Sequence, residues 1–317
     1  KPKDFLIDRR VYVARGEAEF IIQNIVHAIN RNRIVDDIKG ISFLKMGEMV
    51  ETESVGIIED LDRLLPPLRH LIDDKDDYFN PSLKGGPVAP ILTSRGSSAD
   101  AISLAREIEW RRFNDGRKPP VIFRTPKSIA EEFENIKGLG YKAVSVIDDL
   151  FLSGGKERVL DICRCLKVVG LPFAIISRCD MILDEEMVAA LRNAGCEHVE
   201  LIIESMDTDT VGRAIELLSK YHIEATANIT FGSSPSETTK SMTETIKKVS
   251  ELPINYCAFK VATPLHPNLS RKDLERAVKR ANRKFYLKPS RIWFQLKKID
   301  SLKALKDLII TCWRVIK

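Results

Sequence analysis

The sequence has no apolar run approaching the roughly 20 residues that cross a bilayer, which excludes a membrane-spanning segment. Cysteine is sparse, and the spacing of the six residues is not that of a disulfide framework, so a reducing compartment is expected. The five histidines are scattered without metal-ligand spacing, and no Ser-His-Asp order or phosphate-binding loop is present. Because the sequence also lacks an apolar signal core and an initiating Met, it reads as a mature or truncated piece with a cytoplasmic location.

What the sequence does contain is typical of a folded globular protein, with 44% hydrophobic and 30% charged residues over 317 positions. Its charge is uneven. Residues 270–317 hold 15 Lys and Arg against four Asp and Glu, an excess of +11, although the whole chain carries only +5. Such a basic segment indicates either an anionic partner or the solvated faces of packed helices.

The first part of the chain predicts a small α/β segment over residues 1–52. A short strand at 11–15 precedes an amphipathic helix that begins near Phe20, and a β-hairpin is expected around Met46 and Gly47. Residues 53–87 are rich in proline and glycine and are expected to form a wrapping linker.

From residue 88 to residue 264, short apolar strands alternate with amphipathic helices, which predicts a parallel sheet with right-handed crossovers. The expected strands are 89–94, 143–148, 173–178, 198–204, 225–232 and 257–263. The expected helices are 101–114, 127–137, 156–168, 184–193, 211–221 and 236–251. Residues 265–317 then form a basic, helical C-terminal region.

Six such units fit either an incomplete (β/α) barrel or a doubly wound sheet. Polar residues follow the expected strands, and in a barrel these positions meet at one mouth. A doubly wound nucleotide fold would carry a Gly-rich loop after its first strand, and TSRGSSAD does not fit GxGxxG. The predicted fold is therefore a partial (β/α)6 barrel of the TIM type.

Several segments resemble, in order and spacing, the cobalamin-associated radical-SAM enzymes. They are TSRG at 93–96, IDDLF at 147–151, SRCD at 177–180, LRNAGCEHVELIIES at 191–205 and FGSSPSET at 231–238. Upstream, ARGEAE at 14–19 resembles the stretch that leaves the cobalamin-binding domain in that family. The resemblance covers nearly the whole chain, but most of the cobalamin domain is missing.

The resemblance implies S-adenosylmethionine (SAM) and a 4Fe-4S cluster, whose three cysteines follow TSRG in the family. Ser97, Ala101 and Leu104 occupy those positions here. Because the cluster requires thiolate ligands, we predict that it is absent. Of the remaining cysteines, only Cys179 is expected near the barrel mouth.

Other family roles transfer to single residues. In the family, the residues at the positions of Asp148 and Asp149 face the amino group of SAM. The alternative is that both aspartates are solvated turn residues. Glu204 corresponds to a position that binds ribose hydroxyls or an arginine such as Arg178, with a structural ion pair as the alternative.

Arg95 and the GSSPSET loop are also open to two interpretations. Arg95 holds a ligand carboxylate or locks the first loop. Ser233 or Ser234 faces a ligand, or Ser234 and Glu237 form a capping box for the next helix. His266 is the histidine placed nearest the mouth.

The predicted function is a cluster-less radical-SAM relative that binds SAM or another ligand in its barrel mouth and acts as a regulatory partner. The alternative is an active radical-SAM enzyme, catalysing methyl transfer or rearrangement, with a cluster held by other ligands. The basic region predicts an anionic membrane surface as a further partner, since Trp293 and Phe294 accompany the charge. A protein partner also fits, whereas nucleic acid is disfavoured because no nucleic-acid-binding motif accompanies the charge.

Overall fold

The computed structural model describes residues 2–8, 10–80, 82–83, 86–96, 110–114, 116–203, 208–262 and 268–297. It divides into two compact units, Lys1–Pro67 with Thr93–Ser128, and Leu68–Leu92 with Ile129–Lys317.

The first unit contains a three-stranded antiparallel sheet in the order β1-β2-β3 (Val13–Ala14, Ile41–Lys45 and Glu48–Glu51). Helix α1 (Glu19–Asn30) packs on it through Ile21 and Ala28, which join Ile41 and Phe43 in a small core. The expected hairpin turn is confirmed. Met46 and Gly47 both have positive φ, 54° and 86°, as a two-residue type I′ turn requires.

Two further strands of this unit, β5 (Ser94–Arg95) and β6 (Ile122–Phe123), pair antiparallel. The expected first barrel strand at 89–94 is therefore interrupted, because Ser94 belongs to this second pairing. Short 3-10 turns, η1 (Pro2–Asp4) and η2 (Leu61–Arg63), occur in the same unit, and η3 (Arg69–Leu71) and η4 (Lys75–Asp77) in the second.

The second unit is built on a six-stranded parallel sheet in the order β11-β10-β9-β8-β7-β4. The strands are β4 (Val88–Ile91), β7 (Ala143–Val146), β8 (Phe173–Arg178), β9 (Cys196–Ile202), β10 (Glu224–Phe231) and β11 (Tyr256–Val261). Spatial order follows chain order without reversal, so right-handed crossovers place every helix on the same side of the sheet. The sheet therefore curls into half of a barrel, which confirms the predicted fold class; a doubly wound sheet would reverse direction at a switch point.

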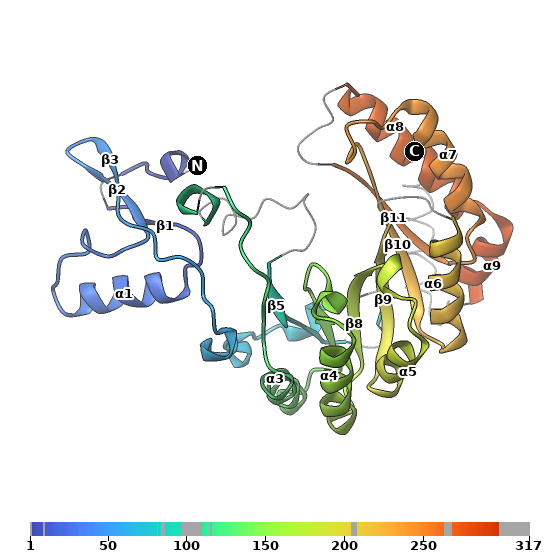
Figure 1. Ribbon diagram of the computed structural model, residues 1–317, viewed down its shortest axis with the longest axis horizontal. Coiled ribbons are helices and arrows are strands. Elements are labelled where there is room, and N and C mark those ends of the chain that lie inside the picture. The colour runs from blue at the N-terminus through green and yellow to red at the C-terminus, as the bar shows by residue number, and fades with distance from the viewer. Residues whose placement is uncertain are drawn as a thin grey trace. The chain divides into compact units, whose positions relative to one another are not determined.

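Helices lie along the outer side of this curled sheet (Figure 1). They are α3 (Pro126–Gly138), α4 (Lys156–Val169), α5 (Glu185–Asn193), α6 (Thr208–Lys220), α7 (Thr239–Glu251), α8 (Arg271–Tyr286) and α9 (Pro289–Lys297). Two 3-10 turns, η5 (Phe151–Gly154) and η6 (Cys179–Met181), follow β7 and β8. The helices expected between the strands are confirmed, apart from 101–114, most of which lies outside the described residues.

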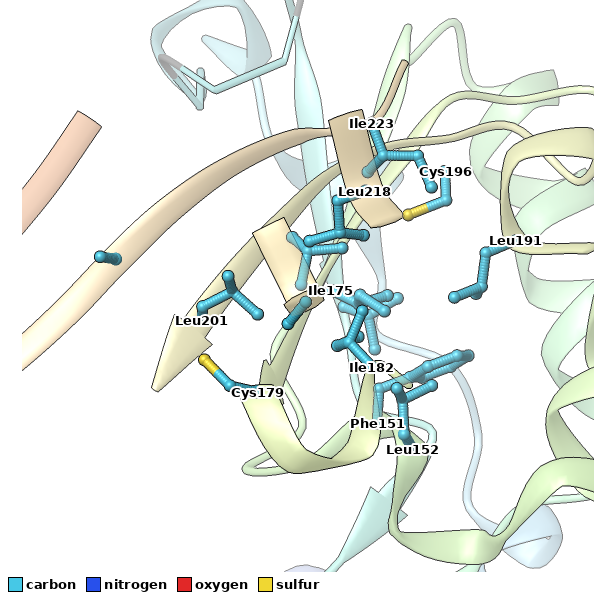
Figure 2. Packing of buried hydrophobic residues seen from close by; sticks show 14 of the residues in the cluster. Phe151, Leu152, Ile175, Cys179, Ile182, Leu191, Cys196, Leu201, Leu218 and Ile223 are labelled. Atoms are coloured by element: carbon cyan, nitrogen blue, oxygen red, sulfur yellow. The ribbon is translucent and has the colours of Figure 1, made fainter. Parts of the chain in front are cut away.

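The core fills the space between sheet and helices. Alternate strand residues such as Ile175 and Leu201 meet the apolar faces of the helices, represented by Leu191 and Leu218 (Figure 2). Full burial of one such side chain contributes about 1.5–3 kcal/mol.

The C-terminal region contains the expected basic helices. Helix α8 is capped by Ser270, whose side chain accepts a hydrogen bond from the Asp273 amide. Its apolar stripe of Leu274, Ala281 and Phe285 is buried, and α8 packs against α7 and β11. Among the described residues, no helix is long and apolar enough to cross a membrane.

Candidate functional site

The candidate site is the concave face of the half-barrel, opposite the helices. Side chains of a strand alternate between the two faces of its sheet. Ile175 of β8 and Leu201 of β9 pack among the helices, so their neighbours Ile176 and Glu200 lie on the concave face. Those neighbours are only partly buried, which leaves this face accessible to a ligand.

The middle of the concave face is polar. The Asn228 amide of β10 donates a 2.9 Å hydrogen bond to the Glu200 carboxylate of β9. Thr226 lies beside Glu200 in the register, and Thr230 lies beside the exposed Lys260 of β11. Carboxylate, amide, hydroxyl and ammonium groups thus occur together on three adjacent strands.

One side of the same face is apolar. Ile147, which directly follows β7, is 47% exposed, and Leu92, which directly follows β4, is 38% exposed. Ile202 lies beside Arg178 in the register of β9 and β8. A ligand on this face would therefore meet charged groups at the centre and apolar carbon next to them.

Sequence reasoning missed Glu200, Asn228 and Lys260, because it considered only the residues that follow the strands. A signal for Glu200 was present. A carboxylate between Val199 and Leu201 in an apolar strand has to face away from the core, since an unpaired buried charge is costly.

The two aspartates predicted after β7 lie in different surroundings. Asp148 is 1% exposed and interacts electrostatically with Arg158 of α4. Burial lowers the pKa of Arg158, and the Asp148 charge opposes that shift. Asp149 is half-buried. The Asp148 charge therefore acts on a residue of the helix layer, and Asp149 is the more accessible carboxylate.

Arg178 is the last residue of β8 and is partly exposed. Its guanidinium forms a two-point contact with the Asp180 carboxylate, with Nε 3.0 Å from Oδ1 and the Nη2 group on Oδ2. The arginine predicted to contact Glu204 therefore has a carboxylate partner two residues away.

Ser233 follows β10 and donates a 3.1 Å hydrogen bond to the Thr230 carbonyl, while Ser234 lies 2.9 Å from Ser236. The capping box expected from Ser234 and Glu237 is wrong. Helix α7 is capped instead by Thr238 and Ser241, which exchange side-chain and backbone hydrogen bonds.

The Glu237 carboxylate has a different role from the expected cap. It accepts a hydrogen bond from the backbone amide of Gly232, whose φ is +84°. This contact fixes the turn that follows β10.

Arg95 lies in the first unit, where it contacts Glu17, two residues before α1, and Glu19, the first residue of α1. Burial opposes the charge of Arg95, but hydrogen bonds and attraction from both carboxylates outweigh it and hold its pKa above the ordinary value. Burial likewise opposes ionisation of Glu19, yet Arg95 holds the pKa of that carboxyl below its ordinary value. These contacts support the interpretation of Arg95 as a lock on the first loop.

The other predicted positions lie outside the described residues. They are Glu204, His266 and the three replaced cluster positions Ser97, Ala101 and Leu104.

Four of the five cysteines among the described residues are unsuited to an iron–sulfur cluster, which needs thiolate ligands that converge on one point. Cys163, Cys179, Cys196 and Cys257 are all buried. Burial raises the pKa of Cys163 to about 12 and that of Cys179 to about 11, and it also raises those of Cys196 and Cys257. These thiols therefore stay protonated and apolar at neutral pH.

Their positions are equally unsuitable. Cys196 opens β9 and Cys257 lies near the start of β11, as predicted, at the end of the sheet opposite the mouth. Cys179, expected near the mouth, packs in the core beside Leu201 (Figure 2). Among the described residues, no three His, Cys, Asp or Glu side chains come together as a metal site.

No protein-family profile matches the chain, but individual proteins are similar to it in sequence and in fold. The chain is 25% identical over 266 residues to the uncharacterized methyltransferase PH0819 of Pyrococcus horikoshii, covering 80% of this chain and 55% of that protein. It is 26% identical over 254 residues to the anaerobic magnesium-protoporphyrin IX monomethyl ester cyclase of Rubrivivax gelatinosus, covering 74% of this chain and 44% of the relative. The chain thus spans about half the length of the curated relatives it matches.

The fold is similar to that of the radical S-adenosylmethionine methyltransferase TsrM from Kitasatospora setae. The structure with tryptophan and a SAM analogue gives a TM-score of 0.61 at 16% identity, covering 78% of this chain and 51% of that one. The structure with cobalamin and a [4Fe-4S] cluster gives a TM-score of 0.58, covering 79% and 51%. The chain has the half-barrel fold of these two structures.

Proposed function

We propose that this chain is a radical-SAM-type half-barrel that binds SAM, or a ligand with the same pattern of charges, without a 4Fe-4S cluster. It acts by binding, as a regulatory partner, and not by radical chemistry. One observation carries the proposal. The concave face is polar, and all three cluster cysteines are replaced.

The groups on the concave face match the parts of SAM. Glu200 and Asn228 offer acceptors and donors for ribose hydroxyls or an ammonium group, and Lys260 offers a positive charge for a carboxylate. Ile147 and Leu92 supply apolar surface for a purine ring. Asp149 and Glu204 are added from the family resemblance.

The cluster positions support binding without redox chemistry. The Ser97 hydroxyl is a poor ligand for iron, and Ala101 and Leu104 have no ligating atom. The buried thiols described above cannot replace them, because each is held protonated within the core.

The deciding experiment is anaerobic reconstitution with iron and sulfide, followed by metal analysis and absorption spectroscopy. We expect no stoichiometric iron. About four irons per chain with a broad band near 400 nm would overturn the proposal and favour an active radical-SAM enzyme with other cluster ligands.

Ligand binding is tested separately by calorimetry with SAM. Each charge-assisted contact is worth roughly 1.5–3 kcal/mol, so Asp149→Ala, Glu200→Ala and Glu204→Ala should each weaken affinity about tenfold or more. Glu197→Ala is the matched control, because Glu197 lies near the amino end of the same strand, away from the mouth. Absence of SAM binding removes the proposed ligand, and unchanged affinity in all three variants removes the proposed site.

A further inference from the structure

A groove on helix α8 is lined by basic side chains. It has a volume of about 480 Å³, and its lining residues are Arg276, Lys279, Arg280, Arg283 and Lys284. All five are exposed. They follow the spacing i, i+3, i+4, i+7 and i+8 over nine positions, so they form one face about 12 Å long at 1.5 Å per residue. No acidic side chain of the described chain lines this groove.

Repulsion among the basic side chains of this face destabilises the isolated helix. Like charges three or four residues apart repel each other, and the acidic residues of α8 lie only in its first turns. Asp273 contacts Arg276 at 3.4 Å, and Glu275 contacts Arg271 at 2.8 Å. The negative end of the helix dipole favours basic residues in the last turn alone. An anionic surface would attract all five basic side chains of this face.

Exposed apolar side chains follow the basic face. Leu287 is 41% exposed, Ile292 is 40% exposed and Trp293 is 61% exposed. Leu287 directly follows α8, and the other two lie in α9. Basic residues accompanied by tryptophan and aliphatic side chains are typical of surfaces that lie at a membrane interface.

The basic face of α8 and the exposed apolar side chains that follow it are connected by one buried contact, between Arg291 and Phe285. The Arg291 guanidinium of α9 stacks 3.5 Å from the centre of the Phe285 ring. It donates hydrogen bonds to the carbonyls of Ser250, Leu252, Ile254 and Phe285. Phe285 lies on the buried side of α8, opposite the basic face, and Trp293 lies about 200° around α9 from Arg291. Both the basic face and Trp293 therefore point away from the stacked side chains of Arg291 and Phe285.

We propose that the basic face of α8, together with Leu287, Ile292 and Trp293, binds the surface of an anionic membrane. The basic side chains attract the lipid headgroups, and Trp293 inserts at the level of the headgroups. The charge complementarity favours an anionic surface, and the exposed apolar side chains favour a lipid over a polar polyanion.

Vesicle co-sedimentation of the full chain tests this proposal. Binding should be strong to phosphatidylcholine vesicles that contain phosphatidylserine and weak to phosphatidylcholine alone. It should fade as salt shortens the Debye length from about 10 Å at 0.1 M to about 3 Å at 1 M. Each basic residue near such a surface contributes a factor of roughly five, so the variant R280E/R283E/K284E should bind at least 100-fold more weakly.

The matched control is K142E/R164E/K167E, which makes the same change in net charge at exposed positions elsewhere on the second unit. It should bind far better than the α8 variant. Trp293→Phe should remove the blue shift of tryptophan fluorescence that vesicles produce. Equal binding to both vesicle types, equal losses in the two triple variants, or binding of single-stranded RNA in preference to anionic vesicles would each overturn the proposal.

Discussion

Arg69 and Glu132 form a buried ion pair in the second unit. Their side chains are 4% and 5% exposed, and the Nη2 and Oε1 atoms are 2.7 Å apart. The same Nη2 group also donates a 2.7 Å hydrogen bond to the Pro90 carbonyl. One guanidinium therefore joins η3, α3 and β4.

Arg69→Met should lower the free energy of unfolding by about 3–5 kcal/mol, because it leaves the Glu132 carboxylate buried without its guanidinium. Denaturant titration measures the loss. The double variant Arg69→Met/Glu132→Leu should recover most of it. Arg271→Met is the control, since Arg271 and Glu275 form an exposed pair whose loss should cost no more than about 0.5 kcal/mol. Equal effects of the two single variants would contradict the prediction.

The placement of candidate site residues at the ends of strands could be predicted from the sequence, because the apolar pattern shows where each strand ends. Arg178 ends its strand, and Asp149 and Ser233 come shortly after theirs, as expected. The sequence could not show that Asp148 interacts electrostatically with Arg158 or that Arg178 contacts Asp180, because these interactions depend on side-chain direction. Glu200 was missed because its signal lies within a strand.

Two glycines, one inside a helix and one at a helix end, allow the effect of backbone conformation on stability to be tested. Gly212 lies inside α6, and a Cβ atom there would meet no atom within 4 Å. Gly170 ends α4 with φ of +64°, and a Cβ atom there also meets no atom within 4 Å. The two sites differ in backbone conformation and not in available space.

Gly212→Ala should raise the free energy of unfolding by about 0.5–1 kcal/mol, because alanine is the better helix former. Gly170→Ala should lower it by about 1 kcal/mol, because an L residue is strained in the left-handed conformation. Thermal and denaturant unfolding measure both changes. Changes of the same sign in the two variants would show that backbone conformation does not control these sites.

The barrel strands and helices could be predicted because their apolar patterns are periodic. The β5–β6 pair was missed, since its two-residue strands carry no periodicity and Ser94 pairs with Phe123, far along the chain. The cap of α7 was misplaced because Ser234 and Thr238 both begin plausible capping patterns. Burial of Met242, Ile246 and Val249 fixes the helix that follows Thr238.

The buried thiols give the whole molecule a sensitivity to alkaline pH. A thiol ionises near pH 8.5 in the unfolded chain, whereas burial raises the pKa of Cys163 to about 12 in the folded protein. Between these values the folded state retains a proton that the unfolded state loses. Stability is therefore fully present below pH 8.5 and falls as the pH rises toward 12.

The free energy of unfolding should fall between pH 8 and pH 10, with Cys163 contributing about 2 kcal/mol of the loss. In Cys163→Ala the fall should be smaller by that amount, measured by urea titration at both pH values under reducing conditions. Val159→Ala, a buried position of the same helix without a titratable group, should keep the wild-type pH dependence. A fall of equal size in Cys163→Ala and the wild type would contradict the prediction.

The outer edge of β4 has a consequence for association between chains. A strand at the edge of a sheet presents unpaired backbone groups that can recruit a strand from another molecule. Here the Val88 amide donates to the Tyr78 carbonyl at 2.7 Å, Pro90 has no amide hydrogen, and Arg69 occupies the Pro90 carbonyl. The half-barrel therefore blocks strand addition at this edge, so that neither a seventh strand nor a neighbouring copy can extend the sheet there and begin aggregation.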